Sequence, residues 1–166
     1  MIYLMKANHS DADKEWLFQR NIPADENGFT NEYHGISRRD FSSALDTMLS
    51  HSEGRMLPEG WVPQTVYYLW DEDNIVGTFH FRHHLCDSLI EGSGHIGYYI
   101  APEFRGRGYA RRGLALLIDE IKERIPEEEI YLRVNRDNPA SLSVILANGG
   151  YIHHSDDKHH YVRIRK

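Results

Sequence analysis

The stretch YYIAPEFRGRGYARRG, from Tyr98 to Gly113, decides the fold. It completes an apolar run in which Ile96, Tyr98 and Ile100 alternate, as residues on one face of a β-strand do. Beyond it the period changes, and apolar residues recur every three or four positions up to residue 125, as on an amphipathic helix. The stretch therefore predicts a strand, a glycine-rich loop and a long helix in succession.

Positive charge and glycine are concentrated in this loop. The eight residues from Arg105 to Arg112 hold four arginines, two glycines and no acid, although the 166-residue chain has a formal net charge of -6. A helix N-terminus presents unpaired N–H groups and about half a unit of positive charge. Gly106 and Gly108 leave no Cβ to block a close ligand. The loop therefore predicts a phosphate or pyrophosphate site, although it matches neither a Walker A loop nor the dinucleotide fingerprint.

The composition is that of a soluble globular chain, and we expect one domain over residues 1–166. The acidic net charge argues against general nucleic-acid binding. The single cysteine, Cys86, cannot form an intramolecular disulfide. The N-terminal apolar stretch is too short for a signal peptide, and no apolar run approaches the roughly 20 residues that span a bilayer. We expect a cytoplasmic protein that binds neither nucleic acid nor membrane.

Around this centre the sequence predicts consecutive strands followed by a crossover. We expect strands at 2–6, 65–70, 75–82, 95–101 and 130–134, helices at 10–19, 37–52, 108–125 and 138–147, irregular chain at 21–34, 53–64 and 85–94, and a last hairpin turning at 155–158. This order predicts an α/β (α+β) fold, in which helices flank one mixed, mostly antiparallel sheet with a central β-α-β unit.

The loop sequence RGRGYA, Arg105 to Ala110, fits the signature R/Q-x-x-G-x-G/A of the GNAT superfamily of N-acetyltransferases. Its context, from the strand IGYYIAP through the amphipathic helix to the strand IYLRVNRDN and the helix start NPAS, resembles the superfamily core over Thr65 to Tyr151. The runs from Leu57 to Leu85 and from Gly94 to Ala110 further resemble a bacterial group of predicted acetyltransferases. Residues before Glu53 carry little recognisable signal.

The resemblance implies that acetyl-CoA is the cosubstrate, with its pyrophosphate on the backbone N–H groups of the loop. Its pantetheine arm would pair with the strand edge at Tyr98 to Ile100, as an added strand would. The implied cosubstrate-binding residues are Tyr98, Ile100, Arg105, Gly106, Arg107, Gly108, Tyr109, Ala110, Asn138 and Ser141. The implied activity is acetyl transfer to a primary amine, by direct attack in a ternary complex, with a small-molecule acceptor favoured.

Catalytic residues are predicted less completely. The resemblance implies that the Tyr98 backbone N–H stabilises the oxyanion. Some members of the superfamily carry a glutamate base where this chain has Gly94, and many carry a tyrosine acid where it has Ile145. Glu91 or His95 acting through water is our hypothesis for the base. The two departures also motivate an alternative, a catalytically silent CoA-binding regulatory module, and a nucleotide-binding protein unrelated to CoA is a third interpretation.

Eleven histidines invite a metal-site interpretation. The last hairpin would bring the pairs His153–His154 and His159–His160 near each other. We interpret these residues as strand and turn positions and expect no metal. A homodimer formed through the same hairpin is a further hypothesis.

Overall fold

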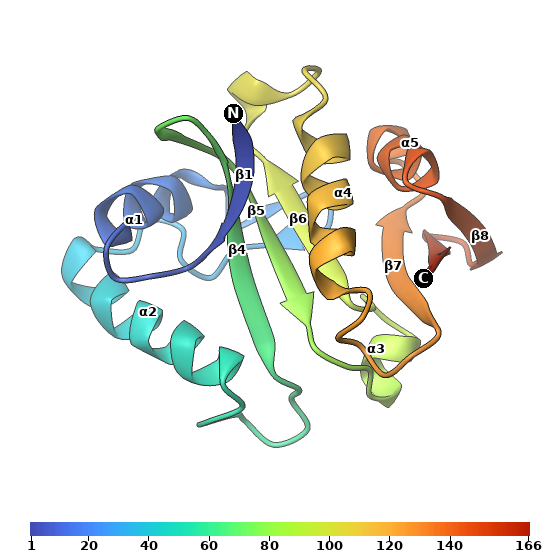
Figure 1. Ribbon diagram of the computed structural model, residues 1–166, viewed down its shortest axis with the longest axis horizontal. Helices are drawn as coiled ribbons and strands as arrows, with labels where there is room; N and C mark the ends of the chain where they lie inside the picture. The colour runs from blue at the N-terminus through green and yellow to red at the C-terminus, as the bar shows by residue number, and fades with distance from the viewer.

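The computed structural model describes residues 1–166, and the chain folds into two larger sheets and a two-stranded one, with helices packed around them (Figure 1). The elements are β1 (Ile2–Lys6), α1 (Ala12–Asn21), β2 (Asp25–Glu26), β3 (Phe29–Thr30), α2 (Arg38–Ser52), β4 (Gln64–Asp71), β5 (Asn74–Arg82), α3 (Asp87–Ile90), β6 (Ile96–Ile100), a 3-10 turn (Pro102–Phe104), α4 (Tyr109–Ile121), β7 (Glu129–Asn135), α5 (Pro139–Ala147), β8 (Gly150–Ser155) and β9 (His159–Arg165). The predicted strands and long helices are confirmed, with ends that differ by a few residues. No helix combines the length and the apolar content needed to span a membrane.

The expected α/β fold, with mostly antiparallel strands flanked by helices, is confirmed, but the longer strands form two sheets where the sequence predicts one. The first has the order β1-β4-β5-β6 and the second the order β7-β9-β8, and all of their ladders are antiparallel. A single bridge, Gly94 to Leu132, joins them. The ladder stops there because the Tyr131 N–H donates to the His95 ring nitrogen Nδ1, 2.9 Å away, instead of to a backbone carbonyl. Strands β6 and β7 then separate, so β6 has a free edge.

Both faces of the first sheet are covered, which explains why β4 is apolar almost throughout. Tyr67 and Leu69 point to one face, where they join the cluster around α4, whereas Tyr68 and Trp70 point to the other, where they pack with α2. In Figure 1, α1 and α2 lie on one side of this sheet and α4 lies across its other face. A strand buried on both faces has no polar alternation, as the run VYYLW shows.

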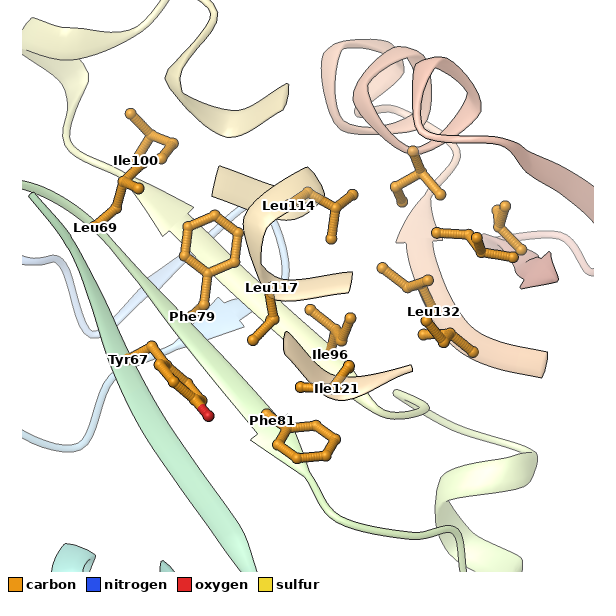
Figure 2. Packing of buried hydrophobic residues seen from close by; sticks show 14 of the residues in the cluster. Tyr67, Leu69, Phe79, Phe81, Ile96, Ile100, Leu114, Leu117, Ile121 and Leu132 are labelled. Carbon is orange, nitrogen blue, oxygen red and sulfur yellow. The ribbon is translucent and has the colours of Figure 1, made fainter. Parts of the chain in front are cut away.

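Helix α4 confirms the amphipathic pattern. Its residues Leu114, Leu117 and Ile121 are fully buried and belong to the same cluster as the aromatic side chains of the first sheet (Figure 2). Gly113 allows the close approach, because a Cβ at this position would lie 2.5 Å from the ring of Phe79. The helix is therefore fixed firmly against the sheet, and its first turn holds a defined position at the end of β6.

The segment expected to be irregular between residues 21 and 34 contains a small hairpin. Strands β2 and β3 pair around Asn27 and Gly28, whose φ angles of 53° and 83° suit a tight hairpin turn. The dipeptide Asn-Gly is a strong sequence signal for such a turn. The connection after β5 likewise contains one short helix, α3, which the sequence does not predict.

Candidate active site

A cavity of about 930 Å³ lies where the two sheets separate. Its walls come from β5, β6, the loop before α4, β7, α5 and the β2–β3 hairpin. Nine of the ten predicted cosubstrate-binding residues line it, namely Tyr98, Ile100, Arg105, Gly106, Gly108, Tyr109, Ala110, Asn138 and Ser141. The tenth, Arg107, does not line the cavity. The fold therefore gathers residues from the loop and from α5 around one space.

The loop at the C-terminal end of β6 presents a run of free backbone donors. No N–H group from Gly106 to Arg111 donates to an acceptor within the protein, and the first bonded one is that of Arg112, 3.1 Å from the Gly108 carbonyl. Gly106 and Gly108 have φ angles of 75° and 78°, a region that L side chains rarely adopt. A Cβ at Gly106 would meet nothing within 4 Å. The arrangement is that of an anion cradle at a helix N-terminus.

The four arginines of the loop differ in their surroundings. The Arg105 guanidinium donates to the Glu26 carboxylate at 2.8 Å and to the Ile100 carbonyl at 2.9 Å. Arg112 folds back onto the Arg107 carbonyl at 3.1 Å, and Arg111 faces the cavity. The loop therefore keeps a high positive charge density, with Arg105 also fixing its conformation.

Strand β6 turns unused backbone groups toward the gap between the sheets. The Ala101 N–H donates to the Val76 carbonyl of β5 at 3.0 Å. Because ladder bonds alternate along an antiparallel pair, the N–H groups of Ile100 and Tyr98 point the other way, into the gap. An extended ligand could pair with this edge.

The side chain of Tyr98 crosses toward α5. Its hydroxyl lies 2.7 Å from Ser141 Oγ, and its ring stacks on Phe79 with centroids 5.4 Å apart. Burial raises the pKa of Tyr98 to about 12, so the phenol is protonated at neutral pH. The Asn138 side chain caps α5 by accepting from the Ser141 N–H at 3.2 Å. Tyr98 thus offers a backbone donor on the gap side and a phenol donor within the cavity.

Neither Glu91 nor His95, the two residues of the hypothesis for the base, lines the cavity. Glu91 is exposed and does not line the cavity. His95 is fully buried, and both of its ring nitrogens are engaged. Nδ1 accepts from the Tyr131 N–H, so Nε2 carries the hydrogen and donates to the Glu127 carboxylate at 2.9 Å. Burial lowers the pKa of His95, and the neutral ring holds the sheets together at their bridge.

The β2–β3 hairpin forms a wall that the sequence analysis did not predict. Glu26 accepts hydrogen bonds from the Tyr99 hydroxyl at 2.7 Å and from Arg105. These bonds, led by the one from Arg105, lower the pKa of Glu26. At the hairpin tip, a Cβ on Gly28 would lie 2.9 Å from the Asn135 side chain of β7. The hairpin therefore reaches from the first sheet to the second and closes one side of the cavity.

His80 is another cavity residue that was missed. It lies on β5 opposite Gly97, and its ring meets that of Phe29 with centroids 5.2 Å apart. Its Nε2 atom is shielded from solvent and has no hydrogen-bond partner. Burial, assisted by the charge of Arg82, lowers the pKa of His80 to about 3, so the ring is neutral at neutral pH. The sequence HFRHH gave no sign of which histidine would face the cavity.

The structure contains no group of three or more histidine, cysteine, aspartate or glutamate side chains placed to hold a metal ion. In the last hairpin, His154 stacks on Tyr161 with centroids 4.4 Å apart, and the His160 ring lies 2.7 Å from the Ser155 hydroxyl. These contacts are those of strand residues on a surface.

Comparison with known proteins identifies one family. Residues 7–150 match the model of the acetyltransferase (GNAT) domain. No curated protein matches the sequence significantly.

Solved structures share the fold over nearly the whole chain. One is the microcin C7 self-immunity acetyltransferase MccE in complex with acetyl-CoA and AMP, at 14% identity and a TM-score of 0.68, with 99% of this chain and 92% of that one covered. Another is a GNAT-family acetyltransferase from Streptococcus pneumoniae, at 14% identity and a TM-score of 0.65, with 99% of each chain covered. A third is the spermidine N-acetyltransferase from Vibrio cholerae in complex with CoA and spermine, at 14% identity and 0.65, with 99% and 95% covered. At such identities the likeness shows the fold alone.

Proposed function

Because the chain belongs to the GNAT acetyltransferase family, we propose that it transfers an acetyl group from acetyl-CoA to a primary amine of a small molecule. The observation that carries the proposal is the run of free N–H groups from Gly106 to Arg111, which opens into the cavity beside the free edge of β6. Two solved neighbours are described as complexes with acetyl-CoA or CoA, which supports the choice of donor.

The cavity offers groups that suit the pyrophosphate and the amide-containing arm of this donor. The loop donors and arginines suit a pyrophosphate, and the glycines leave room for it. The outward N–H groups of Tyr98 and Ile100 suit an amide-containing arm that lies along the strand. Ser141 and Asn138 of α5 face the same space. Acetyl-CoA would supply an acetyl thioester whose carbonyl carbon is open to attack.

We assign direct transfer within a ternary complex. The amine nitrogen bonds to the carbonyl carbon, the carbon–sulfur bond breaks, the amine loses a proton and the sulfur gains one. The Tyr98 N–H, which points into the gap, stabilises the negative charge that develops on the carbonyl oxygen. The Tyr98 phenol is protonated and supplies a proton to the sulfur. This phenol would replace the α5 tyrosine that is Ile145 here.

On the amine side, His80 is placed better than Glu91 or His95. The His80 side chain lines the cavity, and its Nε2 atom is shielded from solvent and has no partner within the protein. A rotation of the ring that exposes this atom would let it accept a hydrogen bond from the amine or from a water that relays its proton. The low pKa of His80 makes it a weak base, so this role is one of orientation and relay rather than storage of a proton.

The test begins with thermal unfolding in the presence of acetyl-CoA, CoA or ATP, followed by thiol release with a panel of primary amines. We expect acetyl-CoA and CoA to raise the melting temperature, ATP to raise it less, and at least one amine to release thiol above the hydrolysis rate. Stabilisation without turnover of any amine would favour the silent CoA-binding module. No stabilisation at millimolar acetyl-CoA would refute the proposal.

A further inference from the structure

Two arginines on the cavity wall have no carboxylate partner. Arg82, the last residue of β5, directs Nη1 to the Gly94 carbonyl at 3.1 Å, and its Nη2 would lie 3.8 Å from a Cβ added to Gly97. Arg133, on β7, has an Nη1 that would lie 3.9 Å from a Cβ added to Gly92. Both guanidinium groups therefore flank the same stretch of chain at the N-terminal end of β6, and both line the cavity.

Their charges repel each other. Burial, together with the charge of Arg133, lowers the pKa of Arg82 to about 10, so the group is still a cation at neutral pH. Holding two like charges together with one of them shielded from water costs free energy, unless an anion sits between them. Neither arginine makes an ion pair, whereas Arg105 at the other end of β6 does.

A structural role explains only part of this arrangement. The bond from Arg82 to the Gly94 carbonyl, with a longer contact of 3.5 Å to Ser93, fastens the bend before β6. It uses one of the two terminal nitrogens of the fork. Arg133 is exposed, and neither it nor the rest of the Arg82 fork is needed for that bend.

The pair is also too far from the loop to serve the same phosphates. Strand β6 has five residues, which at about 3.3 Å per residue separates its ends by roughly 13 Å. The loop cradle follows its C-terminal end, and Arg82 and Arg133 stand at its N-terminal end, with Tyr98 between. An anion at the second end would belong to a molecule other than the part of the cosubstrate held by the loop.

We propose that the amine acceptor carries an anionic group, a carboxylate or a phosphate, which binds between Arg82 and Arg133 while its amine approaches Tyr98. The proposal rests on the acetyltransferase function proposed above. The single carboxylate of the cavity, Glu26, is already bound by Arg105 and Tyr99, so little negative charge is left to hold a polyamine. The expected acceptors are therefore amino acids or phosphorylated amines.

The test compares matched alkylamines that differ only in the anion: 4-aminobutyrate with n-butylamine, and O-phosphoethanolamine with ethanolamine, with spermidine as the cationic case. Thiol release from acetyl-CoA gives kcat/KM for each. We expect the anionic member of at least one pair to exceed its neutral match by about tenfold or more, the effect of one charge-assisted contact. The pair with the larger ratio of kcat/KM, anionic over neutral amine, shows whether the site prefers a carboxylate or a phosphate.

Substitutions test whether Arg82 and Arg133 cause the preference for the anionic amine. Arg133→Gln, at an exposed position where folding is not at risk, should bring the ratio close to one and leave the KM for acetyl-CoA unchanged. Arg82→Lys should lower the ratio partially, because it keeps the charge and loses the fork. Arg39→Gln, on the exposed face of α2 and away from the cavity, is the matched control and should keep the ratio.

The two proposals can fail separately. The melting-temperature shift caused by acetyl-CoA reports the acetyltransferase proposal. The difference between the shifts caused by the anionic and the neutral amine, measured with CoA present, reports this inference even if no thiol is released. Equal shifts and equal rates within every pair, a preference for spermidine, or a ratio unaffected by Arg133→Gln would overturn it.

Discussion

The two ends of β6 both face arginines, yet they are built in different ways. At the C-terminal end, four arginines come from one run of eight residues, and six neighbouring N–H groups are free. At the N-terminal end, Arg82 and Arg133 come from different sheets, and the backbone around them is bonded. A run of free backbone donors can therefore come from one short continuous segment, whereas the two arginines proposed to bind the acceptor come from segments that only folding brings together.

Two histidines near the N-terminal end of β6, His95 and His80, also differ in how they are bonded. His95 has both ring nitrogens engaged and fixes the bridge between the sheets. His80, on the neighbouring strand, has a shielded nitrogen without a partner and faces the cavity. A buried ring whose polar atoms are all bonded stabilises the fold, whereas a buried nitrogen without a partner is uncommon and calls for an explanation. The N-terminal end of β6 is therefore anchored by His95, and the unpaired nitrogen of His80 is the observation behind its proposed role.

The largest effect is expected from a substitution in the loop at the C-terminal end of β6. Gly108→Val places a branched side chain at a φ of 78° and beside the free N–H groups, and it should weaken acetyl-CoA binding by about 100-fold or more. Gly60→Val is the matched control, since Gly60 has a φ of 80° and lies outside the cavity. Calorimetric titration of both variants measures the difference. Equal affinities in the two variants would show that the loop does not hold the cosubstrate.

A smaller effect is expected from a substitution of Tyr98, which lies midway along β6. Tyr98→Phe removes the phenol and keeps the backbone N–H, so kcat should fall by about tenfold to 100-fold while the KM for acetyl-CoA changes little. Tyr151→Phe, which removes a hydroxyl bonded to Glu129 outside the cavity, is the control. Steady-state kinetics with the best acceptor measure both. An unchanged kcat in Tyr98→Phe would exclude the phenol as the proton donor.

The smallest effect is expected on the pH dependence of stability, through His80 near the N-terminal end of β6. The pKa of His80 is about 3 in the folded chain and about 6.5 when unfolded, so the unfolded chain binds more protons between these values. Stability is therefore complete above pH 6.5 and falls as the pH drops toward 3, and His95 acts in the same direction. Between pH 7 and pH 5, His80 should lower the free energy of unfolding by about 1–2 kcal/mol, which corresponds to a decrease of roughly 2–8 °C in melting temperature.

His80→Gln should remove that part of the pH dependence. Thermal unfolding at pH 7 and pH 5 should show a smaller decrease for this variant than for the wild type. His153→Gln, at an exposed position of β8, should follow the wild type. Parallel curves for all three proteins would contradict a buried neutral His80.

Sequence reasoning was sufficient for most elements and for the loop. Strand β1 and helix α2 have the bounds or caps expected, including the Ser37 hydroxyl that accepts from the Asp40 N–H at 3.0 Å. It missed the β2–β3 hairpin, although Asn27-Gly28 was a readable signal, and it did not predict the division of the sheet. The division depends on the His95 ring taking a backbone N–H from a distant strand, which no local pattern reveals.

Local sequence sets the period of each strand and helix, the glycines of the tight turns and the concentration of arginine at one helix start, because these are properties of neighbouring residues. Packing sets which histidine is bonded and which is unpaired, brings Tyr98 to Ser141, and places Arg82 and Arg133 on one wall. These depend on contacts between segments far apart in the chain, where burial and pairing are set by packing.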